Sequence, residues 1–532
     1  MAAAPYGKAT GMGTYINPGN AAFASIVADD YVDKTGLIEL VNEVAGTPRK
    51  LVCVTRPRRF GKSFAAQSLV AYYDCSCDSH SLFEGLDVAR STDYERHLNA
   101  YNVVRLDMTE FVIESGGNVA PLVEERLMAE LATEFPDVEP GGWLTDALLG
   151  VVRATGRKFV FVIDEWDAPI RENAHDEAAK ESWINLLRLL FKNASFTGEA
   201  VEIAYITGIL PVKHYGTQSA LNDFDEFTMV QPARYARYVG FTKGEVEALA
   251  ARYGMSMDDL RHWYDGYELP GVGHVYAPFS VMRACQRGQI GSYWTSSEIY
   301  ESLRIYIDMD FDQLQGTVTQ LLGGDKVRVN LLSFGNDMAD VRNADDVLTL
   351  LVHLGYLAYD CETGFVHVPN EEIRAEFRVA IGESRHSEIA RIVKGSEALL
   401  RASWALDGDA VADAVQHAHD YGCAPLYYND EQALRAVVKA AYIAAVDHYE
   451  IIEELPGGRG FADIAFLPKR RSQAPAMVVE LKWDKPAETA LDQIRSRDYL
   501  APLRDLKVPV LLVGITYDSE TKSHTCAIEE LR

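Results

Sequence analysis

The sequence predicts an α/β protein of several domains, beginning with a parallel sheet that carries helices on both of its faces. Three observations lead to this prediction. Between about residues 47 and 240, apolar segments of strand length alternate with stretches of helical periodicity. From about 241 to 400 helical patterns dominate, and a smaller α/β pattern then follows. The 532 residues are enough for roughly three to four domains, and we expect domains over 1–240, 241–400 and 401–532.

The composition is that of an ordinary folded protein with an excess of acidic residues. Hydrophobic residues make up 48% and charged residues 24% of the chain, which excludes a largely disordered protein. The formal net charge is −27, so nucleic acid would be repelled at long range and could bind only at local basic patches. No apolar run reaches the roughly 18 residues of a membrane helix, the start has no apolar signal segment, and the seven cysteines form no C-x-x-C pair. We therefore expect a reduced, cytoplasmic protein with no membrane partner.

The first domain is expected to contain four strands, with a helix directly after the first of them. The apolar spacing of this helix predicts that Phe64, Leu69, Val70 and Tyr73 form its buried face. The four expected strands are 50–54, 103–107, 159–163 and 203–206.

The other two domains have patterns of their own. In the mainly helical middle region, a helix at 344–355 precedes short strands at 356–360 and 365–368, which is compatible with a small winged-helix module. In the last domain we expect a helix at 431–446, strands at 449–454, 462–467 and 477–481, a helix from 487 and a strand at 508–515.

A basic segment between the first strand and its helix has the form of a phosphate-binding P-loop. The segment ends in Gly61-Lys62-Ser63, the closing part of the pattern G-x-x-x-x-G-K-[ST]. Backbone N–H groups at such a helix start cradle phosphate, while Lys62 would reach the β/γ-phosphates and the Ser63 hydroxyl would bind Mg²⁺. Arg56 stands where the first glycine would be, so the alternative is a basic turn that only contains G-K-S. The residues expected to bind ATP are Arg56, Pro57, Arg58, Arg59, Phe60, Gly61, Lys62 and Ser63.

A second motif supports ATP binding. The apolar strand at 159–163 runs into two adjacent carboxylates, Asp164 and Glu165. Asp164 would hold Mg²⁺ through water, and Glu165 would orient or deprotonate the attacking water as a catalytic residue. The alternative is a strand that ends in an ordinary polar turn. Thr207, after the next strand, could contact the γ-phosphate or the attacking water.

Together these motifs resemble, in their order, those of bacterial AAA-ATPase-like proteins. The resemblance implies a P-loop NTPase domain, and in that family Arg commonly stands where the first glycine of the loop would be. It also implies a smaller carboxyl-terminal domain of the PD-(D/E)XK nuclease superfamily, with a restriction-endonuclease-like α/β fold. We can derive no chemistry for the segment 263–267 and favour an aromatic-packed Asp-Gly turn there. The segments that resemble the family are 31–35, 55–63, 161–165, 207–208, 263–267 and 277–280.

The last domain contains the D…E-x-K pattern of that nuclease superfamily, formed by Asp463, Glu480 and Lys482. Residues two apart on a strand point to the same face, so Glu480 and Lys482 should lie side by side, where Asp463 can meet them from the preceding strand. The two carboxylates offer hard oxygen ligands for Mg²⁺ or Mn²⁺. Lys482 would position the attacking water and offset charge in the transition state. The alternative is a β-hairpin with surface charges.

The same resemblance suggests two further catalytic residues, one on each neighbouring helix. Glu431, in the first turn of the preceding helix, could complete the metal site, but an acid favoured by the helix dipole is an equal alternative. Gln493, in the following helix, matches a family glutamine but could equally lie on a solvated helix face.

The sequence as a whole predicts an ATP-binding protein coupled to a metal-dependent DNA endonuclease, with ATP and Mg²⁺ as cofactors. The sequence leaves open whether Mn²⁺ can serve at the nuclease site, whether RNA is a substrate and whether the protein forms a homo-oligomer. A role in defence against foreign DNA or in mobile-element biology would suit such a protein. The alternative is an ATP-dependent regulatory or scaffold protein whose nuclease-like domain binds nucleic acid or protein without cleaving.

Overall fold

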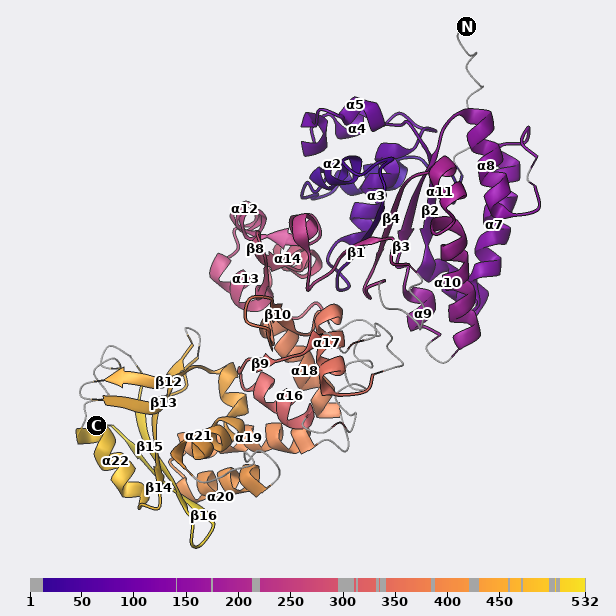
Figure 1. The fold of residues 1–532 in the computed structure, drawn as a ribbon. Coiled ribbons are helices and arrows are strands. Elements are labelled where there is room, and N and C mark those ends of the chain that lie inside the picture. Colours follow the sequence, from indigo (N-terminus) through magenta and orange to yellow (C-terminus); the bar gives the residue numbers. More distant parts are fainter. Residues whose placement is uncertain are drawn as a thin grey trace. The chain divides into compact units, whose positions relative to one another are not determined.

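The computed structural model describes residues 13–531 with several internal gaps, and within it the chain forms two compact units (Figure 1). The first unit is Met1–Ser296 with Arg328–Ile373, and the second is Ser297–Val327 with Arg374–Arg532. None of the described helices is both long and apolar enough to cross a bilayer. The residues inside this span that are not described are 140, 174–175, 213–220, 295–310, 312–313, 332–333, 335–340, 384–387, 421–429, 458–459, 470–471, 497–502 and 504–507.

A five-stranded parallel sheet forms the centre of the first unit, with strand order β2-β3-β4-β1-β5. The sheet confirms the four expected strands to within two residues at each end. Sequence reasoning missed β5, because it has only three residues and two of them are acidic. The strands are β1 (Leu51–Thr55), β2 (Asn102–Asp107), β3 (Phe159–Asp164), β4 (Val201–Gly208) and β5 (Asp225–Phe227).

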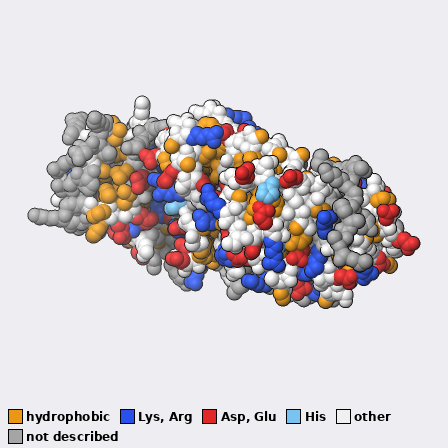
Figure 2. All heavy atoms as spheres, turned by 90° about the horizontal axis from the view of Figure 1, so that it is seen from above, with side chains coloured by type: hydrophobic (Ala, Val, Ile, Leu, Met, Phe, Trp, Pro, Cys, Tyr) orange, Lys and Arg blue, Asp and Glu red, His pale blue; other side chains and the backbone are white. Residues whose placement is uncertain are grey.

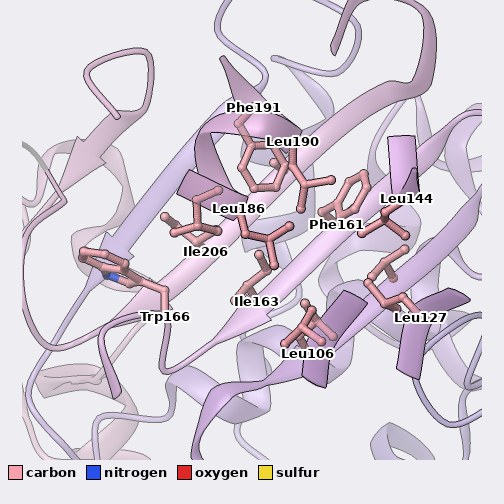
Figure 3. Close-up of a cluster of buried hydrophobic side chains, with 14 of the residues drawn as sticks. Leu106, Leu127, Leu144, Phe161, Ile163, Trp166, Leu186, Leu190, Phe191 and Ile206 are labelled. Carbon is pink, nitrogen blue, oxygen red and sulfur yellow. The ribbon is translucent and has the colours of Figure 1, made fainter. Parts of the chain in front are cut away.

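Helices cover both faces of this sheet (Figure 1). On one face, leucines from three helices pack on the apolar side chains of the strands and bury Phe161, Ile163 and Ile206 completely (Figure 3). The helices of this face are α7 (Val119–Glu134), α8 (Leu144–Thr155), α10 (Glu177–Phe191) and α11 (Ala194–Ala200). The other face carries α3 (Lys62–Tyr73), packed against α1 (Ala21–Val27) and α2 (Gly36–Asn42). The short helices α4 (His80–Phe83), α5 (Tyr94–His97), α6 (Met108–Ser115) and α9 (Ala168–Arg171) complete the domain.

The expected buried face of α3 is wrong at one residue, Phe64. Leu69, Val70 and Tyr73 are buried, but the Phe64 side chain is 55% exposed. Each helical residue turns by about 100°, so Phe64 and Tyr73, nine residues apart, point to opposite sides of α3. Phe64 instead faces a cavity at the start of the helix.

A small three-stranded sheet and three helices follow the parallel sheet. Their shared core buries Tyr264, Tyr276 and Val281. Further along, a helix and a hairpin appear where the sequence predicts them, as α17 (Ala344–Leu354), β10 (Ala358–Asp360) and β11 (Phe365–His367). The small sheet consists of β6 (Phe241–Thr242), β8 (Gly273–Tyr276) and β7 (Tyr267–Leu269), and its helices are α12 (Lys243–Tyr253), α13 (Met257–Tyr264) and α14 (Pro278–Arg287).

The segment 263–267 is a packed Asp-Gly turn, as favoured from the sequence. The Asp265 carboxylate accepts a hydrogen bond of 2.9 Å from the Tyr276 hydroxyl and lies 2.9 Å from Nδ1 of His274. A side chain at Gly266 would collide with the backbone of Pro369, so only glycine fits there. The ring of Tyr267 packs edge-on against Phe60 of the P-loop at 5.3 Å. This turn therefore supports the loop from behind.

The second unit is built on a mixed five-stranded sheet with strand order β12-β13-β14-β15-β16, in which only β14 and β15 pair in parallel. The four strands expected here are confirmed. The polar edge strand β16 had no apolar pattern to reveal it. The strands are β12 (Tyr449–Gly457), β13 (Gly460–Pro468), β14 (Ala476–Trp483), β15 (Val510–Asp518) and β16 (Ser523–Glu530).

Two cores flank this sheet. The larger one packs residues of three helices against one face, and the smaller one packs α22 (Ala487–Ser496) against the other. The helices of the larger core are α19 (Glu388–Trp404), α20 (Gly408–Ala418) and α21 (Glu431–Ala441). Three further elements are α16 (Leu314–Leu322), β9 (Val327–Arg328) and α18 (Glu371–Glu383).

Candidate functional site

The P-loop lies at the carboxyl edge of the parallel sheet, between β1 and α3. Gly61 caps the start of α3 with a left-handed φ of 89°, a conformation that glycine adopts without strain. The turn directs the backbone N–H groups of the first helical turn, which have no partner within the helix, toward the space in front of the loop. Because β1, β3 and β4 are parallel, the residues that follow each of them meet at the same edge.

A cavity of about 680 Å³ opens in front of this loop. One wall is the loop itself with the first turn of α3, including Lys62, Ser63 and Phe64. The other walls come from residues 25–34, from 238–241 and from α14. Sequence reasoning missed these walls, although two of its family-like segments, 31–35 and 277–280, supply part of them.

Four of the predicted residues converge beside the cavity. The Lys62 side chain is only 3% exposed, and its Nζ lies 3.2 Å from Oε1 of Glu165 and donates to the Pro57 carbonyl oxygen at 3.1 Å. The Ser63 hydroxyl is close enough to the Asp164 carboxylate to lower its pKa. The structure therefore brings Lys62, Ser63, Asp164 and Glu165 together, although β4 lies between β1, which precedes the loop, and β3, which leads to the two acids.

The two carboxylates differ in their electrostatic surroundings. Burial and the neighbouring charge of Glu165 raise the pKa of Asp164 to about 6, although Ser63 and Lys62 oppose this. Burial would also raise the pKa of Glu165, but the charges of Lys62 and Arg171 outweigh it and hold that pKa below its ordinary value. The carboxylate and the neighbouring serine hydroxyl are both hard oxygen donors. A divalent cation would bind them and would stabilise the ionised form of the buried carboxylate. Ser63 and Asp164 therefore fit Mg²⁺.

Arg171 is a residue of this site that sequence reasoning missed. From α9, it donates from NH2 to Oε2 of Glu165 at 2.9 Å and from Nε to Asp167 at 2.9 Å. Asp167 in turn accepts from the backbone N–H groups of Ile209 and Leu210, just after β4. The sequence signal that could have revealed Arg171 is its helical i, i+4 spacing from Asp167, directly after the acidic strand end.

The remaining predicted residues of the loop divide into two groups. Arg58, Arg59 and Phe60 line the cavity, and Arg59 stacks over the ring of Phe279 at 4.6 Å. Arg56 is fully buried away from the cavity and donates from NH1 to the carbonyl oxygens of Thr55 at 2.7 Å and Phe227 at 3.0 Å. Burial lowers the pKa of Arg56 to about 10. Arg56 thus ties β1 to β5 behind the loop.

Thr207 is also buried, and its hydroxyl donates to the Val54 carbonyl oxygen of the neighbouring strand at 2.8 Å.

A second cluster lies in the mixed sheet of the other unit. On β14, the Lys482 Nζ lies 3.0 Å from Oε1 of Glu480 and donates to the Leu481 carbonyl oxygen at 2.8 Å. Gln493 of α22 donates to the same Glu480 oxygen, and Glu431 of α21 lies 3.9 Å from Lys482. Glu480 is only 2% exposed. The two neighbouring helices thus each supply one polar side chain to the strand that carries Glu480 and Lys482.

Asp463 joins this cluster from β13. Its Oδ2 accepts the backbone N–H of Leu481 at 2.8 Å, and its Oδ1 accepts NH2 of Arg435 at 2.8 Å. Arg435 also donates from NH1 to Glu454 at 3.1 Å. Sequence reasoning missed Arg435, although it lies one helical turn after Glu431 on α21.

The donors of the second cluster fit a divalent cation in their chemistry, but they do not form a complete metal site. Asp463, Glu480 and the Leu481 carbonyl are hard oxygen donors of the kind that Mg²⁺ and Mn²⁺ prefer. Among the residues that the structure describes, no three His, Cys, Asp or Glu side chains are grouped so as to hold a metal ion. Water and phosphate oxygens would have to complete the coordination, as is usual for Mg²⁺.

Family models match two separate parts of the chain. Residues 19–217 match the family model described as "Predicted AAA-ATPase", and residues 429–526 match that of the PD-(D/E)XK nuclease superfamily. A curated protein of Azotobacter chroococcum mcd 1, named as an uncharacterized protein in the vnfD 5′ region, is 30% identical over 289 residues. The match covers 52% of each protein, so the chain spans about half the length of this relative.

Two solved structures are similar at low identity. The ORC2 protein of Aeropyrum pernix, in its ADPNP and ADP complexes, is 12% identical with a TM-score of 0.32, covering 67% of this chain and 96% of that one. PCH-2 of C. elegans is 14% identical with a TM-score of 0.20, covering 55% of this chain and 60% of that one.

Proposed function

Because the chain carries an AAA-ATPase-like domain and a PD-(D/E)XK nuclease superfamily domain, we propose that it binds and hydrolyses ATP and cleaves DNA with a divalent metal ion. One observation carries this proposal: in each unit, residues from separate elements converge on one cluster with the donors that its reaction needs. Lys62, Ser63, Asp164 and Glu165 meet at the cavity, and Asp463, Glu480 and Lys482 meet on the mixed sheet.

In the ATP site, each residue has a role that follows from its position. The N–H groups of the loop and Lys62 would bind the β- and γ-phosphates, and Ser63 and Asp164 would hold a cation that neutralises their charge. Phe64 offers an exposed aromatic face in the cavity wall to the rest of the nucleotide. Glu165 orients the attacking water and accepts its proton.

The pairing of Lys62 with Glu165 links binding to hydrolysis. In the structure Glu165 is held by two cations, Lys62 at 3.2 Å and Arg171 at 2.9 Å. A bound triphosphate competes for Lys62, because phosphate oxygens carry more charge than one carboxylate. Glu165 then keeps its hydrogen bond from Arg171 but loses the charge of Lys62, and becomes a stronger base for water.

Replacing Glu165 by glutamine should therefore separate binding from hydrolysis. We expect ATP hydrolysis to slow by about 100-fold or more, the range for loss of a general base, while ATP affinity stays equal or increases because Lys62 loses a competing anion. Phosphate release and equilibrium ATP binding measure the two effects. Glu177→Gln, at a side chain that is 79% exposed, is the matched control. Unchanged hydrolysis in Glu165→Gln would remove Glu165 from the mechanism.

In the nuclease site, the bound metal ion would polarise the scissile phosphate and acidify a water. The chain's own residues prepare that step. Glu480 is oriented by Gln493 and by Lys482, and the Leu481 N–H fixes Asp463. Lys482 provides the positive charge that stabilises the developing charge on the attacked phosphate.

The test of the whole proposal is a cleavage assay on single-stranded, duplex and supercoiled DNA, with and without ATP, in Mg²⁺, Mn²⁺ or EDTA. We expect cleavage in either metal and none in EDTA, because without a cation the carboxylates repel the phosphate backbone. Cleavage that persists in EDTA would contradict the metal-dependent mechanism.

A second candidate function is an ATP-dependent regulatory or scaffold protein whose nuclease-like domain binds without cleaving. The net charge of −27 favours it. Among the described residues in view in Figure 2, acidic and basic side chains are interspersed. No cleavage of DNA or RNA under any nucleotide condition would favour this candidate.

A further inference from the structure

The second cluster is closed by a cation that sequence reasoning did not include. Both carboxylate oxygens of Asp463 are engaged, Oδ2 by the Leu481 N–H and Oδ1 by the guanidinium of Arg435, each at 2.8 Å. The backbone contact belongs to the strand and stays in place. Oδ1 is therefore the oxygen that a metal ion would have to take, and Arg435 occupies it.

Arg435 is placed so that its guanidinium can move. Its side chain is 20% exposed, and its second partner, Glu454, is 66% exposed. The Nε has no hydrogen-bond partner among the described residues. The hydrogen bonds that hold the guanidinium thus go to one carboxylate of the cluster and one surface carboxylate.

We propose that Arg435 acts as a charge latch, a cation that occupies Oδ1 of Asp463 when no substrate is bound. When nucleic acid binds, Arg435 moves to a backbone phosphate, so that the metal ion and the nucleic acid bind together. This inference rests on the proposed nuclease function of the same cluster. A guanidinium beside Oδ1 repels a divalent cation and also removes one of its ligands. Removal of Arg435 from Oδ1 is therefore a condition for complete coordination.

The exchange of partners is chemically balanced. A guanidinium binds both carboxylate and phosphate through charge-assisted hydrogen bonds, so the bond from Arg435 NH2 to Oδ1 of Asp463 can be replaced by one to a phosphate oxygen. The metal ion then takes the place of the guanidinium on Asp463. After the exchange Asp463 is paired with the cation and Arg435 with the phosphate, so neither group is left buried without an opposite charge.

The latch predicts that Mn²⁺ binding without DNA is limited by Arg435. We expect the full-length Arg435→Met protein to bind Mn²⁺ about tenfold more tightly than the unmodified protein, because the competing charge is gone. A phosphorothioate-protected DNA duplex should increase the Mn²⁺ affinity of the unmodified protein, but have little effect on that of Arg435→Met. Electron paramagnetic resonance of free Mn²⁺ measures both effects. It is recorded without nucleotide and in an Asp164→Asn background, which removes the carboxylate ligand of the ATP site.

Three comparisons make the outcome decisive. Arg401→Met, at a surface arginine of α19 in the same unit that is 67% exposed, should leave Mn²⁺ affinity unchanged. Arg435→Lys keeps the charge without the fork and should fall between the unmodified protein and Arg435→Met. If Arg435→Met retains its circular dichroism spectrum and melting temperature but binds Mn²⁺ equally or more weakly, Arg435 only supports Asp463 and the latch is wrong. If Asp463→Asn has no effect on Mn²⁺ binding in any protein, the proposed metal site itself fails.

Discussion

Replacing Lys62 by alanine is expected to lower ATP affinity by about 100-fold or more, since a charge-assisted contact of this kind contributes roughly 3 kcal/mol. The Lys62 side chain is buried at the cavity edge, 3.2 Å from Glu165. Its removal takes away the cation that meets the phosphates and leaves the Glu165 carboxylate near them with less compensation. Equilibrium binding of ATP with Mg²⁺, by calorimetry or a fluorescent analogue, measures the loss.

Lys243→Ala is the matched control for this change, because Lys243 is a half-exposed lysine of α12 whose nearest acid, Glu247, is at 3.9 Å. It should bind ATP as the unmodified protein does. If Lys62→Ala and the unmodified protein have equal affinities, the loop does not bind nucleotide and the P-loop interpretation is wrong.

The second large effect concerns the carboxyl-terminal cluster, where Glu480→Gln or Lys482→Met should reduce metal-dependent DNA cleavage by about 1,000-fold or more. Both side chains are almost fully buried and contact each other at 3.0 Å. Glutamine preserves the shape of Glu480 but removes the charge that a cation needs, and methionine removes the ammonium of Lys482. Conversion of supercoiled plasmid to nicked and linear forms measures the rate.

ATP binding provides the internal control for these variants. Lys62 and Glu480 belong to different compact units, so ATP affinity should stay unchanged when cleavage is lost. Glu488→Gln, in the first turn of α22, should cleave normally. Cleavage that survives Glu480→Ala would place the chemistry elsewhere in the chain or in a contaminating protein.

Local patterns were sufficient to predict the two clusters in outline. The strand before Asp164 is a run of apolar residues. A run of this length that is followed by polar residues can be recognised as a strand from the sequence alone. The pleat alone places Glu480 and Lys482 on one face of β14. The acidic strand end and the shared face of Glu480 and Lys482 each depend on residues within a few positions of each other, where the backbone geometry leaves few alternatives.

Contacts between distant residues required the tertiary structure. The sequence does not show that β4 lies between β1 and β3, nor that Phe64 faces the cavity and not the core. Above all, it does not pair Arg171 with Glu165 or Arg435 with Asp463, because each pair forms only where the docking of a helix on a sheet brings the two charges within hydrogen-bond distance.

The sequence by itself thus determined which residues are candidates for the chemistry, since motif residues are recognised by their type and local spacing. The tertiary structure alone decided which charges hold those residues in the absence of ligand. That choice depends on strand order and helix packing, which are set by the burial of many side chains over the whole domain and not by any short segment.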